Sequence, residues 1–189
     1  VGTRQIQTDY QHSNPAMASR DNTTGFYYTG AQWEVTGKTQ GTARLGYQVK
    51  NFDSNERETF KGFSWDIGFE WLPQEQTLIT VKTTQAAVNP DQDGDYNLQT
   101  RYRIDFKHDW NSYLATELRF LYQEDDYTGE LPGIASRDSE RYSLSAGIDY
   151  QIKRWILLQA NWQYQDKTSD RAGYSFQQNI WTLSTQFSL

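Results

Sequence analysis

The stretch SFQQNIWTLSTQFSL, residues 175–189, alternates between two kinds of side chain. One set is mostly apolar and comprises Trp181, Leu183, Thr185, Phe187 and Leu189. The other set is polar and comprises Thr182, Ser184, Gln186 and Ser188. Because successive side chains of a β-strand point to opposite faces, this pattern predicts a strand with one apolar and one polar face.

A strand with these aromatic residues and an apolar last residue resembles the closing strand of a bacterial outer-membrane β-barrel. The resemblance implies that the barrel-assembly machinery recognises this segment, with Trp181, Leu183, Phe187 and Leu189 as the assembly signal. An amphipathic edge strand of a soluble protein shows the same alternation. The other segments of the chain must therefore decide between the two classes.

The same period of two recurs along the chain and predicts about ten antiparallel strands of roughly 9 to 12 residues, long enough to cross a bilayer when tilted. The clearest strand places Phe63, Trp65 and Ile67 opposite Ser64 and Asp66. The weakest covers residues 1–10, where a charged residue shares a face with apolar ones. An all-β fold follows, an antiparallel up-and-down transmembrane β-barrel.

The connections between the predicted strands alternate between short and long. Short turns are expected at residues 37–41, 72–76, 109–112 and 153–154, and long loops elsewhere, among them 11–22, 51–59 and 124–139. Short turns at one end and long loops at the other are typical of outer-membrane barrels, in which the short turns are periplasmic.

Bulk composition agrees with one folded domain over residues 1–189. Aromatic residues make up 15% of the chain, and only four residues are proline, which argues against disorder. Mean hydropathy is -0.88, and no long apolar run exists, so a transmembrane helix is excluded. The net charge is -6 with acids and bases interspersed, so no nucleic-acid partner is expected. Cysteine is absent, which excludes disulfides and thiolate metal sites.

In the predicted strands after the first, the apolar face carries no charged residue, as lipid contact would require, because a charge near the bilayer midplane costs about 2 to 4 kcal/mol. The polar face is rich in Gly, Ser and Gln, which suit a crowded barrel interior. Tryptophans are expected to anchor the barrel in the membrane as a girdle: Trp71, Trp110, Trp155, Trp162 and Trp181. The expected location is the bacterial outer membrane, with its lipid and lipopolysaccharide as partners.

Four segments resemble a family of β-barrel porins associated with exopolysaccharide biosynthesis clusters in Gram-negative bacteria. They are NFDSNERETFKGFSWDIGFEWLPQEQTLI at residues 51–79, WNSYL from Trp110, RDxxRY from Arg137, and GYSFQQN from Gly173. Members of this family are generally longer. The resemblance implies that the chain is the C-terminal portion of a larger barrel, and we expect other chains or segments to complete it. It also implies a passive role in export or passage of extracellular polysaccharide, and carries no catalytic residues.

Charged residues on the polar face are the candidate pore lining: Arg44, Lys50, Asp66, Glu70, Lys82, Arg101, Arg103, Asp105, Lys107, Glu117, Arg119 and Asp149. In a wide barrel they would line a pore and tune the passage of charged or hydrated polymers. In a narrow barrel they would neutralise one another across strands and fill the interior. The sequence leaves both interpretations open. The second favours a structural or adhesion barrel whose long external loops bind a partner.

No enzyme activity and no cofactor are expected. The two histidines, His12 and His108, belong to opposite ends of the predicted barrel and cannot share one active site. A weak metal candidate is the group Asp91, Asp93 and Asp95, whose oxygens could hold Ca²⁺. Its spacing falls short of an EF-hand loop, so an acidic external turn is the favoured interpretation.

Overall fold

The computed structural model describes residues 1–11, 18–90, 94–129 and 137–188. Within these residues the chain forms ten strands and no helix: β1 (Gly2–Thr8), β2 (Asn22–Thr36), β3 (Thr39–Phe52), β4 (Phe60–Gln74), β5 (Thr77–Val88), β6 (Tyr96–Asn111), β7 (Leu114–Thr128), β8 (Ser139–Lys153), β9 (Ile156–Ser169) and β10 (Phe176–Phe187). Accordingly, no helix in the described part of the chain is long and apolar enough to cross a membrane.

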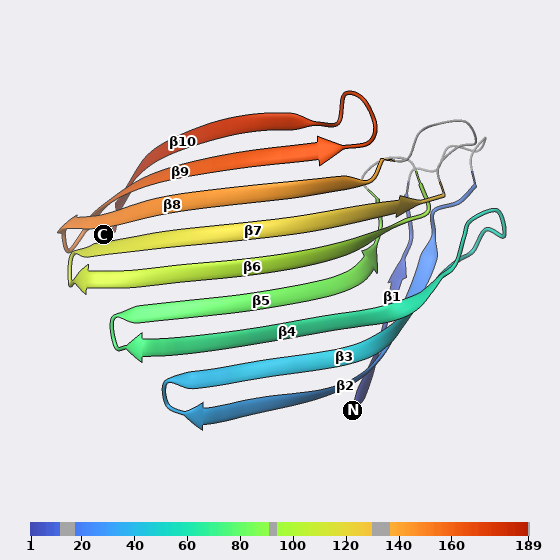
Figure 1. Cartoon of the computed structure of the whole chain (residues 1–189), viewed down its shortest axis with the longest axis horizontal. Coiled ribbons are helices and arrows are strands. Elements are labelled where there is room, and N and C mark those ends of the chain that lie inside the picture. Colours follow the sequence, from blue (N-terminus) through green and yellow to red (C-terminus); the bar gives the residue numbers. More distant parts are fainter. Residues whose placement is uncertain (12–17, 91–93, 130–136, 189) are drawn as a thin grey trace.

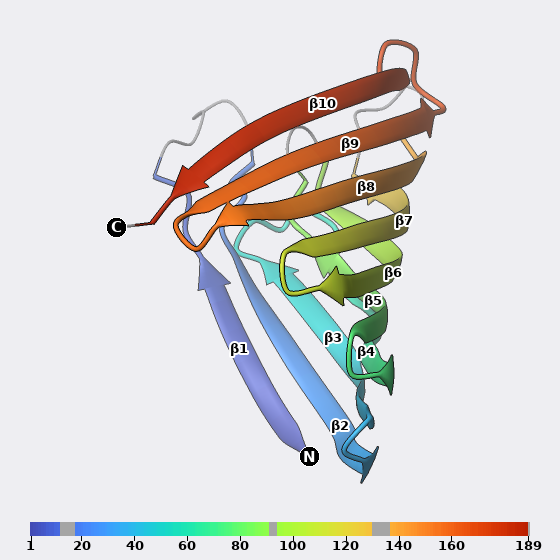
Figure 2. The same ribbon diagram turned by 90° about the vertical axis from the view of Figure 1, so that its left-hand side faces the viewer.

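Each strand pairs antiparallel with the next, in the order β1 to β10, so the predicted all-β up-and-down arrangement is confirmed (Figure 1). The sheet curves strongly and leaves one side open, with β1 and β10 as its edges (Figure 2). Among the described residues these two strands do not pair with each other. The structure is therefore a curved ten-stranded sheet and not a closed barrel.

Three of the four short connections are tighter than predicted, and the fourth has the predicted length of two residues, shifted by one position. Each contains two residues, 37–38, 75–76, 112–113 and 154–155, and all four lie at the same end of the sheet (Figure 1). A register shift precedes each turn, between Glu34 and Thr36 in the first hairpin and between Trp71 and Gln74 in the second. Pro73, expected in a turn, lies inside β4 at this second shift, where its missing N–H breaks no regular ladder bond.

The strands are correspondingly longer than the predicted 9 to 12 residues. β2 to β10 contain 12 to 16 residues each, and β1 contains 7. The predicted loop 124–139 is shorter than expected, because residues 124–128 continue β7 and Ser139 begins β8. Acidic residues are typical of loops, but here they lie within the ends of the strands.

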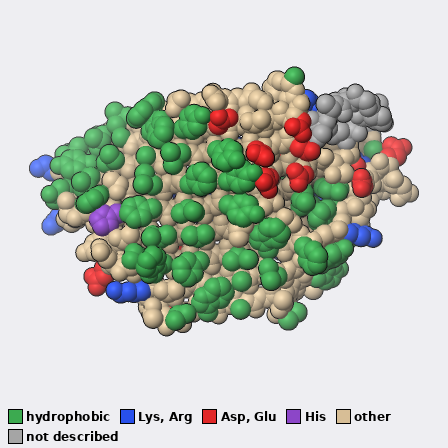
Figure 3. Space-filling model, viewed as in Figure 1, with side chains coloured by type: hydrophobic (Ala, Val, Ile, Leu, Met, Phe, Trp, Pro, Cys, Tyr) green, Lys and Arg blue, Asp and Glu red, His purple; other side chains and the backbone are tan. Residues whose placement is uncertain are grey.

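Burial is inverted relative to a soluble protein. Among the described residues, only Phe60 and Ala87 are buried hydrophobic residues. Large apolar side chains are exposed, including Phe63 at 76% and Leu183 at 73%. Figure 3 shows apolar side chains spread over the convex face of the sheet. Water does not favour such a surface, whereas the lipid interior of a membrane does.

The apolar face is not free of charge, contrary to the sequence-based expectation. Glu124 follows Tyr122 on the outward side of β7 and accepts a hydrogen bond of 2.6 Å from its hydroxyl. Asp166 stands in the same relation to Tyr164 in β9, at 3.1 Å. These acids lie near the long-loop end, where Figure 3 shows acidic side chains on the convex face. On the convex face, the described strands therefore carry charged side chains near the long-loop end.

Candidate functional site

The concave, polar face carries a ladder of ion pairs across neighbouring strands. Arg44 of β3 lies directly opposite Asp66 of β4, with their Nη2 and Oδ2 atoms 2.8 Å apart. Lys82 of β5 reaches the other oxygen of Asp66 at 3.5 Å. The register that pairs these strands thus brings one carboxylate between two cations, as cross-strand pairing of opposite charges predicts.

A second ion-pair group follows on β6 and β7. Asp105 binds Arg103 at 2.7 Å and also pairs with Arg119 on β7. Closer to the short turns, Lys107 and Glu117 form a pair at 3.3 Å. Eight of the twelve predicted lining residues therefore form ion pairs with one another across the concave face.

Four further lining candidates bind neutral partners. Glu70 accepts a hydrogen bond of 2.5 Å from Gln40, and Asp149 accepts one of 3.0 Å from Gln159. Arg101 donates to Gln123 at 2.9 Å. Lys50 is only 2% exposed and lies at the long-loop end, where it donates to Asn22 at 3.0 Å. It also contacts Asn89.

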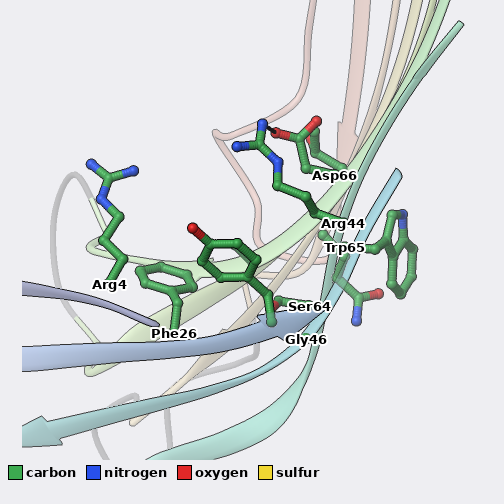
Figure 4. A pocket seen from close by; sticks show the side chains of 11 residues that line it. Arg4, Phe26, Arg44, Gly46, Ser64, Trp65 and Asp66 are labelled. Carbon is green, nitrogen blue, oxygen red and sulfur yellow. Dashed lines mark hydrogen bonds and ion pairs between the residues drawn. The ribbon is translucent and has the colours of Figure 1, made fainter. Parts of the chain in front are cut away.

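The concave face is hollowed in several places. Figure 4 shows one cavity of about 260 Å³, where Arg4 and Phe26 face the Arg44–Asp66 ion pair and Trp65 points away from it. A second, of about 380 Å³, has a mixed-charge lining that includes Glu70, Lys82 and Arg103. A third, of about 590 Å³, is lined by side chains from β5 to β10. The face thus has room for water and small solutes.

At the long-loop end the inner face is crossed by a hydrogen-bonded bridge. Pairing between β4 and β5 stops at Trp65 and Gln85, so the two strands separate beyond this point. The fully buried Gln48 of β3 spans the separation: its amide donates to the Ala87 carbonyl at 2.7 Å and accepts from the Ala87 N–H at 2.8 Å. Gly62, the partner of Gln48 on β4, has no side chain to obstruct it.

The loop between β5 and β6 is held at the same place. Asn89 contacts both Lys50 and Asn22. Arg57 pairs with Asp95 at 2.9 Å, and the second oxygen of this carboxylate accepts from the Glu58 N–H at 2.8 Å. The described parts of this loop therefore lie against β2, β3 and the β3–β4 connection and narrow the long-loop end of the concave face.

Sequence reasoning missed three inner residues. Arg141 was noted only as part of a motif, although it precedes Ser143 by two positions and so shares the polar face of β8. That spacing was a sufficient signal. Gln48 and Gln123 also lie on the polar faces of their strands, but the alternation does not reveal their contacts. Gln48 of β3 reaches past β4 to β5, and Gln123 of β7 is shared by arginines of β6 and β8.

The predicted girdle tryptophans lie at two depths. Trp71, Trp110 and Trp155 are exposed and lie at the short-turn end. Trp162 and Trp181 are in register with each other in the middle of β9 and β10, with ring centroids 6.1 Å apart. Of the other predicted assembly-signal residues, Leu183 and Phe187 are exposed on the outward side of β10, and Leu189 lies outside the described residues.

Of the two histidines, His108 is the one that the structure describes, and its ring contacts neighbouring side chains. His108 hydrogen-bonds Thr77 at 2.8 Å and packs edge-on against Trp110, while His12 lies outside the described residues. Asp91 and Asp93 of the metal candidate also lie outside them. Within the described ranges no group of three acidic, histidine or cysteine side chains is arranged to hold a metal ion.

An antiparallel meander with an apolar convex face, a charged and hollowed concave face, and alternating tight turns and long loops defines the class of outer-membrane β-barrel proteins. The chain belongs to the family described as Putative beta-barrel porin 2, which matches residues 2–188. The predicted porin family is thereby confirmed, and a channel protein rather than an enzyme is what this family indicates. No curated protein sequence matches the chain.

Two solved structures share the fold. The ferripyoverdine receptor of the outer membrane of Pseudomonas aeruginosa superposes with a TM-score of 0.64 and 14% identity, over 89% of this chain. The chain spans only 26% of that receptor. The NanC porin superposes with a TM-score of 0.53 and 10% identity, over 99% of this chain and 92% of the porin. At these identities the likeness concerns the fold alone.

Proposed function

We propose that this chain forms an outer-membrane pore through which extracellular polysaccharide passes. The observation that carries the proposal is the division of the sheet into an apolar convex face and a concave face with charged and amide side chains around open cavities. Polysaccharides present hydroxyl groups that such side chains can bind while water still fills the lumen. Membership of the porin family supports the pore, and the polysaccharide cargo is our proposal.

A pore requires the two sheet edges to be completed. Unpaired strand edges cannot face lipid, because their N–H and C=O groups would lack partners. Ten is an even number of strands, so β1 and β10 run antiparallel and could pair directly. Additional strands from other segments or chains would also pair with these two edges and close the barrel. Either arrangement encloses the concave face.

One observation favours a second function, a narrow structural or adhesion barrel whose external loops bind a partner. The bridge formed by Gln48 and Ala87, together with the pair Arg57 and Asp95, obstructs part of the long-loop end. If this obstruction closed the lumen, the protein would not conduct, and its long loops would be the functional surface.

Conductance of the protein purified from outer membranes distinguishes the two functions. In planar lipid bilayers we expect stable single-channel openings, because the cavities of the concave face would form a continuous aqueous path once the edges are joined. Addition of an extracellular polysaccharide should reduce the current by partial block. Complete absence of openings would support the structural barrel, and openings that no polysaccharide blocks would contradict the proposed cargo.

A further inference from the structure

A cluster of basic side chains surrounds the cavity of about 590 Å³ on the concave face. Its charged lining residues are all cations and come from four successive strands: Lys82, Arg101, Arg103, Arg119 and Arg141. Among the lining residues that the structure describes there is no Asp or Glu. The net charge of the whole chain is -6, so the charge of this cavity lining is opposite in sign to that of the chain as a whole.

The nearby carboxylates are already shared. Asp66 serves both Arg44 and Lys82, and Asp105 serves both Arg103 and Arg119. Each of these acids therefore stands between two cations and neutralises them incompletely. The ion pairs keep the side chains in place but leave positive charge on the cavity wall.

The other two cations bind a neutral group. Arg101 and Arg141 approach the same amide oxygen of Gln123, at 2.9 and 2.6 Å. Gln123 in turn donates to Asp125 at 2.6 Å, so the nearest acid on this side is reached through an amide and not directly. Among the described residues neither arginine forms an ion pair with a carboxylate, and the Nε of Arg141 is buried without a hydrogen-bond partner.

Two guanidinium groups that converge on one amide oxygen keep most of their donors available, since each guanidinium has five N–H groups. Their planar geometry matches a carboxylate, which can accept two parallel hydrogen bonds. Hydroxyl and amide side chains continue the cavity wall toward β9: Ser143, Ser145, Asn161 and Gln163. These groups suit the hydroxyls of a sugar ring beside the charged group.

We propose that this cavity, centred on Arg101 and Arg141, binds the carboxylate of an acidic saccharide and makes the pore selective for anions. The inference rests on the proposed function and deepens it, because it assigns the transported saccharide a negative charge. The acids Glu124 and Asp166 on the outward face do not oppose this selectivity, since they lie on the other side of the sheet.

Binding is tested by calorimetry on the detergent-solubilised protein, with trigalacturonate as the acidic probe, maltotriose as the neutral probe and inorganic phosphate as a simple anion. We expect trigalacturonate to bind and to weaken with added salt, and maltotriose not to bind. The double variant Arg101→Gln, Arg141→Gln should weaken binding about tenfold or more, because charge-assisted hydrogen bonds are lost. Arg154→Gln is the matched control, since Arg154 is exposed in the two-residue turn between β8 and β9 and does not line the cavity.

Selectivity is tested by the reversal potential of the channel in a KCl gradient. We expect the wild type and the Arg154→Gln control to prefer chloride, and the double variant to lose most of this preference. If the double variant does not fold, Arg101→Lys tests carboxylate binding at the same site: it keeps the charge and the chloride preference but loses the planar donor geometry, so trigalacturonate should bind more weakly. Retained heat-modifiable gel mobility shows that each variant is folded.

The experiments test the proposed binding site and the proposed pore function separately. Equal binding of trigalacturonate and maltotriose, phosphate binding as strong as trigalacturonate binding, or binding unchanged in the folded variants would overturn the proposed site. A conducting channel with such results would still be a pore. Conversely, trigalacturonate binding that depends on these arginines in a protein without conductance would retain the site and reject the pore.

Discussion

Replacing Leu118 by arginine should destabilise the folded protein in lipid by about 2 to 4 kcal/mol, the cost of placing a charge on the lipid face near the bilayer midplane. Leu118 is 49% exposed on the convex face, halfway between Leu114 at the short-turn end of β7 and Tyr122. If that exposure is to lipid, an arginine there cannot be hydrated. The folded population in urea should fall about 30-fold or more.

The matched control is Thr80→Arg on the concave face. Thr80 lies between Glu70 and Asp105 in the strand register, at nearly the same depth as Leu118. A new cation there meets two acids and water, so little loss of stability is expected. Urea titrations of protein folded into phospholipid vesicles, followed by tryptophan fluorescence, measure both variants. Equal tolerance of arginine on the two faces would show that the convex face does not contact lipid.

The second large effect is expected at Gln48. Its amide provides both hydrogen bonds of the buried Ala87 backbone that a β4 neighbour would otherwise supply. Gln48→Ala should leave this N–H and this C=O without partners, at a cost of about 1 to 3 kcal/mol for each group that water cannot reach. The temperature at which heat-modifiable gel mobility is lost should fall accordingly.

Two further variants isolate the cause. Gln48→Met keeps the length of the side chain but forms neither bond, so it should be destabilised nearly as much as Gln48→Ala if hydrogen bonding matters most. Gln178→Ala removes an exposed amide that forms one bond of 2.6 Å to Gln165 and should change stability little. A Gln48→Met protein as stable as the wild type would show that the bridge contributes packing alone.

Much of the fold could be predicted from the sequence because alternation is a local property. Each strand from β2 to β10 carries its own apolar and polar faces, so the number of strands and the side of residues such as Phe63 and Asp66 follow directly. Strand ends were less predictable. Pro73 and the acids Glu124 and Asp126 are typical of loops, yet a bulge accommodates the first and the long-loop end of β7 accommodates the others.

The candidate site was predictable in composition but not in arrangement. The polar face identified Arg101 and Arg103 as lining residues, whereas the shared acceptor Gln123 and the bridge at Gln48 depend on the cross-strand register. The strand register depends on turn geometry and bulges as well as on the apolar pattern. The period-two alternation of the sequence does not reveal where the bulges lie. The separation of β4 from β5, which creates the need for the bridge, has the same origin.

Single cysteines on adjacent residues of β8 test most directly whether the two faces meet lipid and water. The sequence contains no cysteine, so Leu144→Cys and Ser145→Cys each introduce one unique thiol. In protein folded into lipid vesicles, the account predicts that a fluorophore at residue 144 is quenched by lipids brominated in their acyl chains. Residue 145 should instead react with a charged, membrane-impermeant thiol reagent. Lipid quenching at 145 with aqueous labelling at 144, or aqueous labelling of both, would contradict the account.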